Sequence, residues 1–362
     1  MALDCITLTS DNAFPVTCDV NMLYSVLRPF LFSLEPERAH AVTFSLLRAA
    51  HRTGLLSLIR TANSDDPGTL MGLKFRNRLG IAAGLDKNAT CVDALGALGA
   101  SFVEVGTVTP NPQSGNPSPR IFRIPAATAL INRMGFPNDG VDAMCERLRH
   151  RHYPGICGVN IGKNASTPLE QAVDDYLACL RAVARYADYI AVNVSSPNTV
   201  GLRNLQAVDH LRPILEALLN ERDRQVTQIG RPLPLVVKIA PDLQLEELQQ
   251  IAALLLELKL DGVIATNTTL QRPTKWPLGA LAEEKGGLSG APVHELSLAT
   301  VRELRRMLGQ AFPIIGVGGI TTAEHALAMR VAGADLVQIY TGLIYRGPEL
   351  ISATLRAMAK QR

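Results

Sequence analysis

From residue 79 to the C-terminal end, the sequence alternates short apolar runs with longer amphipathic segments. Eight runs have the length and β-branched content of strands buried on both faces: 79–83, 102–105, 158–161, 189–194, 235–239, 262–266, 313–317 and 336–340. Segments with helical spacing follow them, most clearly at 172–185, 245–258 and 322–332. This alternation predicts a (β/α)8 TIM barrel, an α/β fold. A doubly wound open sheet is the alternative, but it seldom contains eight parallel strands at such even spacing.

Residues 21–60 precede the barrel pattern and predict a small N-terminal hairpin of two amphipathic helices. Apolar residues at helical spacing end near Leu34, and Pro36 suits the first turn of a second helix that stops near Gly54. The apolar face is large for its length, so it either packs on the barrel or dips into a membrane surface. In the second case five arginines would lie near lipid headgroups: Arg28, Arg38, Arg48, Arg52 and Arg60. We therefore divide the chain into a flexible leader (1–20), the hairpin (21–60) and the barrel (61–362).

Polar side chains recur at the carboxyl ends of the predicted strands. In chain order they are Asp86, Lys87, Thr107, Asn160, Lys163, Asn193, Ser196, Lys238, Thr266, Asn267 and Thr268. The carboxyl ends of barrel strands meet at one face, where ligands bind. We therefore expect a polar site there, with several amides and two or three lysines.

Two of these positions raise chemical alternatives. The fourth strand ends in SSPN, where Pro197 breaks the ladder; alone this motif is typical of a serine-rich turn. No GxSxG surrounds Ser196, so an acyl-transfer triad is not indicated. Lys238 stands in the apolar run VVKIA, where an unpartnered lysine is costly. It could contact an anionic cofactor, form a Schiff base or join a buried ion pair.

The last two strand ends predict a phosphate site. Gly318 and Gly319 follow the seventh strand, and Tyr340, Thr341 and Gly342 end the eighth. Glycines let backbone N–H groups approach phosphate oxygens, and a following helix N-terminus adds a favourable field. A glycine pair alone is a weak signal, but barrels bind phosphate at these two units.

Several classes of function are not indicated. The net charge is +3 without a dense Lys/Arg run, so nucleic acid binding is not expected. Six cysteines show neither CxxC nor metal spacing, which favours reduced thiols in the cytosol, and the seven histidines form no ligand set. No apolar stretch reaches the roughly 18 residues of a spanning helix, and the N-terminus lacks a secretion-signal pattern.

Taken together, the strand ends resemble the dihydroorotate dehydrogenase family, in its class 2, quinone-dependent and membrane-associated form. The motifs that carry the resemblance are AAGLDKN, EVGTVTP, NRMGFPN, GVNIGKN, NVSSPNT, VKIAPD, GVIATNTT, GGLSG, IIGVGGI and LVQIYTG, in the family's order. They span roughly residues 22–360 and leave the leader outside. The resemblance implies oxidation of dihydroorotate to orotate in pyrimidine biosynthesis, with one FMN per chain and a membrane quinone as the final acceptor.

The resemblance also implies roles for individual residues. FMN contacts would be Ala83, Gly84, Leu85, Asp86, Lys87, Thr107, Asn160, Asn193, Lys238, Thr266, Gly290, Gly319, Tyr340 and Thr341. Lys238 would stabilise negative charge on reduced flavin. Substrate contacts would be Lys87, Asn132, Arg133, Met134, Gly135, Phe136, Asn193, Asn198, Asn267 and Thr268. Ser196 would be the general base, a role that a serine can fill only in a closed, preorganised site. The related cytosolic class has cysteine there, and the loop 200–204 is our candidate for a lid.

By the same resemblance, the hairpin forms the mouth of an apolar quinone tunnel, with His40 and Arg123 as polar gates and Tyr340 near the inner end. This implies a peripheral protein on the cytoplasmic face of a bacterial inner membrane, and we expect a monomer. Three rival hypotheses stay open. They are the soluble class using fumarate or a partner's NAD, an aldolase with Lys238 as Schiff base, and a silent barrel acting as a membrane scaffold.

Overall fold

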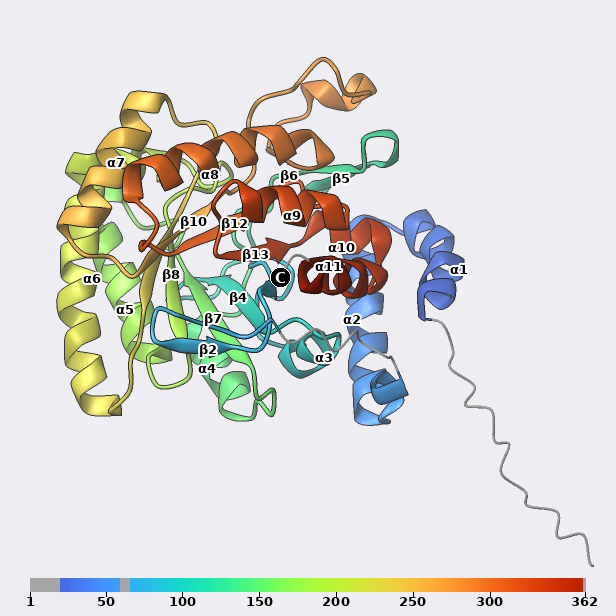
Figure 1. Cartoon of the computed structure of the whole chain (residues 1–362), viewed down its shortest axis with the longest axis horizontal. Coiled ribbons are helices and arrows are strands. Elements are labelled where there is room, and N and C mark those ends of the chain that lie inside the picture. The colour runs from blue at the N-terminus through green and yellow to red at the C-terminus, as the bar shows by residue number, and fades with distance from the viewer. Residues whose placement is uncertain (1–19, 59–65, 361–362) are drawn as a thin grey trace, which may run out of the picture.

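The computed structural model describes residues 20–58 and 66–360. Within them, eight parallel strands close into a barrel, so the (β/α)8 prediction is confirmed (Figure 1). The strands are β3 (Leu79–Ile81), β4 (Phe102–Val108), β7 (Ile156–Ile161), β8 (Tyr189–Asn193), β9 (Leu235–Ile239), β10 (Gly262–Ala265), β12 (Ile314–Val317) and β13 (Leu336–Ile339). Each pairs with the next in this order, and β13 pairs with β3 to close the ring. The predicted leader, apart from Val20, lies outside the described residues.

Helices surround the barrel and cover the outer faces of its strands (Figure 1). They are α3 (Val92–Ala97), α4 (Val141–Arg149), α5 (Ala172–Val183), α6 (Val208–Ile229), α7 (Leu245–Glu257), α8 (His294–Leu308), α9 (Ala323–Val331), α10 (Thr341–Arg346) and α11 (Glu349–Ala359). Local sequence fixes several starts: Gln244 and Glu247 form a capping box on α7, and the Thr322 side chain caps α9. Short 3-10 turns include η1 (Leu55–Leu58), η4 (Leu202–Gln206), η5 (Gly279–Glu283) and η6 (Ala291–Val293).

The amino end of the barrel is filled by apolar side chains. A hairpin of β1 (Gly68–Leu70) and β2 (Leu73–Phe75) brings Phe75 edge-on to Phe102, with ring centroids 5.5 Å apart. Gly80 leaves room for the Phe102 ring, since a Cβ at that glycine would lie 2.3 Å from it. The chemistry of the barrel interior is therefore confined to its carboxyl end.

Two segments outside the predicted barrel strands form a second sheet. β5 (Ile121–Ile124) and β6 (Ala129–Asn132) pair antiparallel, and β11 (Gly287–Gly290) adds to the other edge of β6. The sequence analysis predicted no strand in these segments. Strands of four residues whose partners lie about 155 positions away give almost no local signal. The sheet stands beside the barrel mouth and sets the position of Asn132.

The N-terminal hairpin forms as expected, from α1 (Val20–Ser33) and α2 (Pro36–Arg52). Pro36 occupies the first turn of α2, and the Glu35 side chain caps it through the Arg38 N–H. α2 lies against α3 and β5, α1 contacts α10, and Figure 1 shows α1 furthest from the barrel. Glu37 and Arg120 form an ion pair of 2.8 Å that ties α2 to the barrel mouth. One side of the hairpin thus packs against the barrel.

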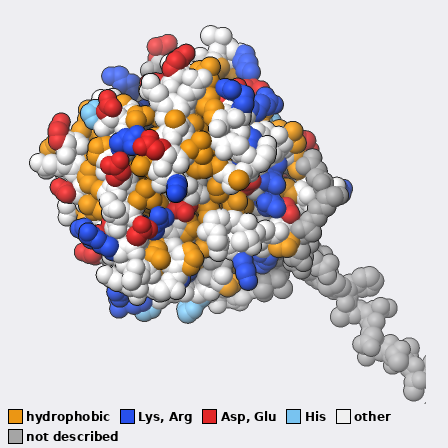
Figure 2. Space-filling model, turned by 60° about the vertical axis from the view of Figure 1, so that its left-hand side comes forward, with side chains coloured by type: hydrophobic (Ala, Val, Ile, Leu, Met, Phe, Trp, Pro, Cys, Tyr) orange, Lys and Arg blue, Asp and Glu red, His pale blue; other side chains and the backbone are white. Residues whose placement is uncertain are grey.

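Three exclusions made from sequence can be compared with the described residues. Figure 2 shows one face on which basic and acidic side chains are interspersed, without the single-sign field typical of nucleic acid binding. Within residues 20–58 and 66–360, no His/Cys/Asp/Glu cluster could hold a metal ion, and no helix is both long and apolar enough to cross a bilayer. Cys91, Cys145, Cys157 and Cys179 are free thiols; Cys5 and Cys18 fall outside the described part.

Candidate active site

A cavity lies at the carboxyl ends of the barrel strands, and most predicted site residues line it. They are Ala83, Gly84, Lys87, Thr107, Asn132, Met134, Gly135, Phe136, Asn193, Ser196, Asn198, Lys238, Thr266, Asn267, Thr268, Gly290, Gly319, Tyr340 and Thr341. Six further lining residues were not predicted: Ala82, Ser289, Val293, Val317, Ile320 and Gln338. Residues from the ends of seven barrel strands, all except β7, and from the second sheet thus meet in one place.

A chain of hydrogen bonds crosses the barrel interior beneath this cavity. Asn193 Nδ2 donates to Thr107 Oγ1 over 2.9 Å, and Thr107 Oγ1 donates to Asn160 Oδ1 over 2.5 Å. Asn160 Nδ2 then donates to Glu104 Oε1 over 2.9 Å. Since β4, β7 and β8 each supply a member, the chain fixes the orientation of two amides and a hydroxyl at the cavity floor.

Glu104 is the centre of this network, and the sequence analysis missed it. Its carboxylate has no exposed surface and also accepts hydrogen bonds of 2.8 Å from Tyr189 Oη and Gln338 Nε2. Lys238 Nζ lies 4.0 Å from Glu104 Oε1, so of the three roles left open for this lysine, an ion pair is formed. Burial lowers the pKa of Lys238 from its ordinary value, and Glu104 opposes that shift.

On the other side of the cavity, amides from three loops face one another. Asn198 Nδ2 donates to Asn132 Oδ1 over 3.1 Å, and Asn267 Nδ2 donates to Ser195 Oγ over 2.9 Å. Thr268 Oγ1 is buried and has no hydrogen-bond partner among the described residues, and the same is true of Gln338 Oε1. Unsatisfied buried polar atoms that line a cavity are the groups that a polar ligand would satisfy.

Ser196 lies between these amides on the turn after β8. Its side chain is buried, with 5% of the residue's surface exposed. The backbone N–H of Asn198 donates to Ser196 Oγ over 3.2 Å, which orients the hydroxyl within the turn. No hydrogen bond that uses the Ser196 proton is present among the described residues, so this proton is available to a partner in the cavity.

The glycine loop after β12 packs directly on the start of α8. Gly319 has φ +67, and a Cβ there would lie 2.4 Å from the backbone of His294. Opposite this loop, Thr341 Oγ1 donates to Ser289 Oγ over 2.9 Å. The close approach requires glycine and leaves backbone N–H groups near the cavity.

Five predicted residues do not line this cavity. Asp86 is buried and accepts hydrogen bonds from the backbone of Thr90 and Cys91, so its carboxylate holds a turn. Leu85 lines the neighbouring cavity instead. Lys163 Nζ donates to backbone carbonyls of its own loop, which leaves two lysines at the cavity. The remaining two are Asn160 and Arg133. Asn160 lies below the cavity floor and accepts a hydrogen bond from Thr107, and Arg133 pairs with Glu284 at 2.5 Å.

A second, mainly apolar cavity adjoins the first. It runs between the hairpin helices and the barrel, and Lys87, Asn132, Met134 and Tyr340 line both cavities. His40 also lines it, and burial followed by the nearby Lys87 charge lowers the pKa of His40 to about 4. Burial lowers the pKa of Lys87 itself to about 8.

Arg123 lies on the wall of the second cavity and also holds the hairpin together. Its guanidinium donates to the carbonyls of Leu34 (2.7 Å) and Phe32 (3.2 Å), and lies 4.9 Å from the Phe32 ring centroid. This guanidinium therefore fixes the turn between α1 and α2 against β5.

Comparisons with known proteins decide the family. The family model described as dihydroorotate dehydrogenase matches residues 68–361. The chain belongs to the dihydroorotate dehydrogenase family. It is 54% identical to "Dihydroorotate dehydrogenase (quinone)" of Acinetobacter baylyi over 93% of this chain and all of the relative. The enzyme of the same name from Ralstonia nicotianae is 53% identical over 94% of this chain and all of its own length.

A solved structure agrees with the fold. The crystal structure of DHODH from Eimeria tenella in complex with ferulenol has a TM-score of 0.83 at 37% identity, and the match covers 92% of this chain and 93% of that one. The chain is thus a dihydroorotate dehydrogenase of the quinone-dependent type, as its motifs indicate. Glu104 and Gln338 belong to the polar network at the cavity and were not predicted from the sequence of this dihydroorotate dehydrogenase. The signal for Glu104 was available, because it and Lys238 are the only charged residues within the eight predicted strand runs.

Proposed function

We propose that this chain oxidises dihydroorotate to orotate at the barrel cavity and passes the two electrons to a quinone that enters through the hairpin cavity. The observation that carries the proposal is the junction of the two cavities, which share Lys87, Asn132, Met134 and Tyr340. One cavity is lined by four asparagine amides together with apolar residues, which suits a cyclic imide. The other is mainly apolar and opens between amphipathic helices, which suits a quinone.

We propose that FMN occupies the floor of the barrel cavity. The buried Thr107, Asn193 and Lys238 side chains suit the flavin ring, and the glycine loop at Gly319 with Thr341 suits the phosphate. A bound FMN would supply the hydride acceptor for C6 of dihydroorotate and the electron donor for the quinone. The positive charge of Lys238 favours electron density on the flavin. Asn160 and Glu104 act from below by fixing Thr107 and Lys238.

The substrate ring lies, in this proposal, among the four amides and the unpaired hydroxyl. Asn132, Asn193, Asn198 and Asn267 offer paired donors and acceptors, and the orphaned Thr268 Oγ1 gains a partner. Lys87 supplies positive charge for the carboxylate of dihydroorotate. The backbone at residues 133–136 closes over the ring.

Ser196 is the general base in this proposal. It takes the proton from C5 as the hydride leaves C6 and passes its own hydroxyl proton onward, so the C5–C6 bond becomes the double bond of orotate. The buried turn excludes water and holds the oxygen in place, which a weakly basic hydroxyl needs in order to act. The quinone takes up two electrons and two protons and leaves as the quinol.

The hairpin is the proposed membrane contact. Val26, Phe30 and Leu46 expose 70%, 59% and 54% of their surface, an unusual concentration of large apolar side chains on one short segment. Arg28, Arg38 and Arg52 lie on the same two helices. We propose peripheral attachment to the cytoplasmic face of a bacterial inner membrane, as a monomer, with His40, Arg123 and Tyr340 lining the quinone route.

The test of the base is Ser196→Ala, with Ser352→Ala in α11 as the control for loss of a buried serine elsewhere. Anaerobic mixing with dihydroorotate should bleach the flavin band far more slowly in Ser196→Ala, by about 10² or more. Reoxidation by a quinone analogue should be unchanged in both variants. Equal bleaching in Ser196→Ala and the parent refutes the base, and borohydride trapping of substrate on Lys238 would favour the aldolase instead.

A further inference from the structure

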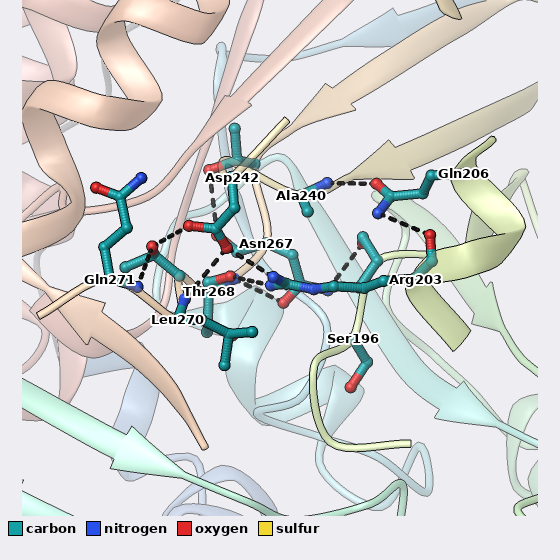
Figure 3. A network of polar contacts seen from close by, with 12 residues as sticks. Ser196, Arg203, Gln206, Ala240, Asp242, Asn267, Thr268, Leu270 and Gln271 are labelled. Carbon is teal, nitrogen blue, oxygen red and sulfur yellow. Dashed lines mark hydrogen bonds and ion pairs between the residues drawn. The ribbon is translucent and has the colours of Figure 1, made fainter. Parts of the chain in front are cut away.

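Arg203 in η4 is one of the residues that hold the turn carrying Ser196 to the barrel. Its Nε donates to the Ser195 carbonyl over 3.0 Å, and its Nη2 donates to the Thr268 carbonyl over 2.7 Å. Its Nη1 pairs with Asp242 Oδ2 at 2.6 Å. Figure 3 shows this fork with Ser196 on the same turn. One side chain therefore joins the peptide next to the base to a substrate-lining residue.

The partner of Arg203 is itself fixed from two directions. Asp242, in the loop after β9, accepts hydrogen bonds from the Thr269 hydroxyl and from the backbone N–H of Leu270 at 3.1 Å. A parallel contact joins the same two loops, since Gln206 Oε1 accepts from the backbone N–H of Ala240 over 2.8 Å (Figure 3). These contacts thereby tie together the loops that follow β8, β9 and β10.

Other contacts also hold this turn: Asn267 Nδ2 donates to Ser195 Oγ over 2.9 Å, and Asn116 Nδ2 donates to the Asn198 carbonyl over 3.1 Å. Val200 exposes 97% of its surface, and Gly201 has φ +69. Pro197 and the glycine leave the segment outside regular structure until η4 begins at Leu202. On the side of the turn that follows Ser196 in the chain, Arg203 is therefore the anchor nearest to regular structure.

We propose that Arg203 is a positioning residue for Ser196. Its hydrogen bonds to the Ser195 and Thr268 carbonyls set the distance between the base and the substrate ring, and the ion pair with Asp242 fixes the orientation of its guanidinium. This inference rests on the proposed role of Ser196 as the base. Arg203 touches neither the cavity nor the reacting atoms. Misplacement of a reacting group by about 1 Å can slow a reaction by about 10².

The chain offers a matched control. Arg222 in α6 pairs with Asp261 at 2.6 Å, with 17% of the arginine side chain exposed, against 18% for Arg203. Asp261 accepts from the backbone N–H of Leu235, at the opposite end of β9 from the cavity. Arg222→Gln thus removes an equally close ion pair, made by an equally covered arginine, that lies away from the base.

The experiment compares Arg203→Gln, Arg203→Lys and Arg222→Gln as FMN-loaded proteins. In Arg203→Gln, flavin bleaching by dihydroorotate should slow about 10- to 100-fold, with FMN content and quinone reoxidation unchanged. Substrate deuterated at C5 should show a larger isotope effect in this variant, because proton removal then limits the rate. Lysine keeps the charge facing Asp242 but cannot fork to both carbonyls, so Arg203→Lys should be intermediate. Arg222→Gln should match the parent.

A second readout is independent of catalysis. Backbone amides of residues 194–204 should exchange hydrogen at least about tenfold faster in Arg203→Gln than in the parent or Arg222→Gln. Bleaching within twofold of the parent, equal slowing in Arg222→Gln, or unchanged exchange at 194–204 each overturns the proposal. If Ser196→Ala bleaches as fast as the parent, the base assignment itself is wrong and the positioning role falls with it. Faster exchange in Arg203→Gln would then identify only a structural anchor.

Discussion

Replacing Glu104 with glutamine removes one charge from the centre of the barrel and keeps the shape of the side chain. Lys238 Nζ, 4.0 Å from the carboxylate, then becomes a buried cation without its counter-charge. Breaking a buried ion pair on one side costs about 3–5 kcal/mol. Glu104 also accepts from Asn160 on one oxygen and from Tyr189 and Gln338 on the other. A glutamine has only one oxygen, so its NH₂ replaces one carboxylate oxygen and at least one charge-assisted hydrogen bond is lost, at a further cost of about 1 kcal/mol.

The sum, about 4 kcal/mol or more, should lower the melting temperature of Glu104→Gln by roughly 8 °C, taking about 2 °C per kcal/mol for a chain of this size. Thermal unfolding followed by circular dichroism measures it. Tyr189→Phe is the matched control, because it removes one hydrogen bond to the carboxylate and leaves the charge pair intact. Its cost should be smaller, about 1.5–3 kcal/mol.

The pH dependence of stability distinguishes the loss of the Glu104 charge from a loss of packing. Burial holds the pKa of Lys238 below its ordinary value of 10.5, so the folded state binds fewer protons than the unfolded state between the two values. Stability therefore rises with pH through that window. Loss of Glu104 lowers the pKa of Lys238 in the folded state further, so the pH range over which stability rises extends to lower pH. The loss of stability of Glu104→Gln relative to the parent should therefore shrink between pH 7 and about pH 9.5. A melting temperature close to that of the parent, or a deficit that does not change with pH, would refute this reasoning.

Three further outcomes follow from single residues. Because the pKa of Lys87 is about 8, orotate affinity should fall above about pH 8 by up to tenfold per pH unit, whereas a flat titration would contradict its role at the carboxylate. His40, with a pKa of about 4, stays neutral at neutral pH, so the quinone KM should not change between about pH 5 and 8; an inflection near 6.5 would contradict this burial. Gly319 has φ +67, and an alanine there would place its Cβ 2.4 Å from His294, so purified Gly319→Ala should lose FMN absorbance. Full flavin content in this variant would contradict the close approach of the two segments.

The barrel was predictable because its signal is local and repeated. Strands such as 189–193 are apolar along their whole length and end in polar residues, and this pattern recurs eight times. The cavity followed from the same pattern, since parallel strands bring their carboxyl ends together. The sequence also contained an unused hint: Glu104 and Lys238 are opposite charges in buried strands, and such charges need partners.

What could not be predicted depends on contacts between distant segments. The pairing of β6 with β11 joins residues about 155 positions apart, and no alternation of apolar and polar residues in either segment predicts it. The Arg203 fork depends on two backbone carbonyls, which every residue possesses, so nothing in the sequence of the turn distinguishes it. Asp86 shows the converse: its position beside Lys87 suggested a ligand contact, but its carboxylate is used by the backbone of the next turn.

Anaerobic mixing tests the proposed reaction most directly. Dihydroorotate is added to the purified protein while the visible flavin band is followed, and then a quinone analogue, fumarate or NAD is added to parallel samples. The account predicts that the band bleaches with substrate and returns with the quinone alone. Return with fumarate or NAD would contradict the proposed route through the hairpin cavity, and a band that never bleaches would contradict dihydroorotate oxidation at the barrel cavity.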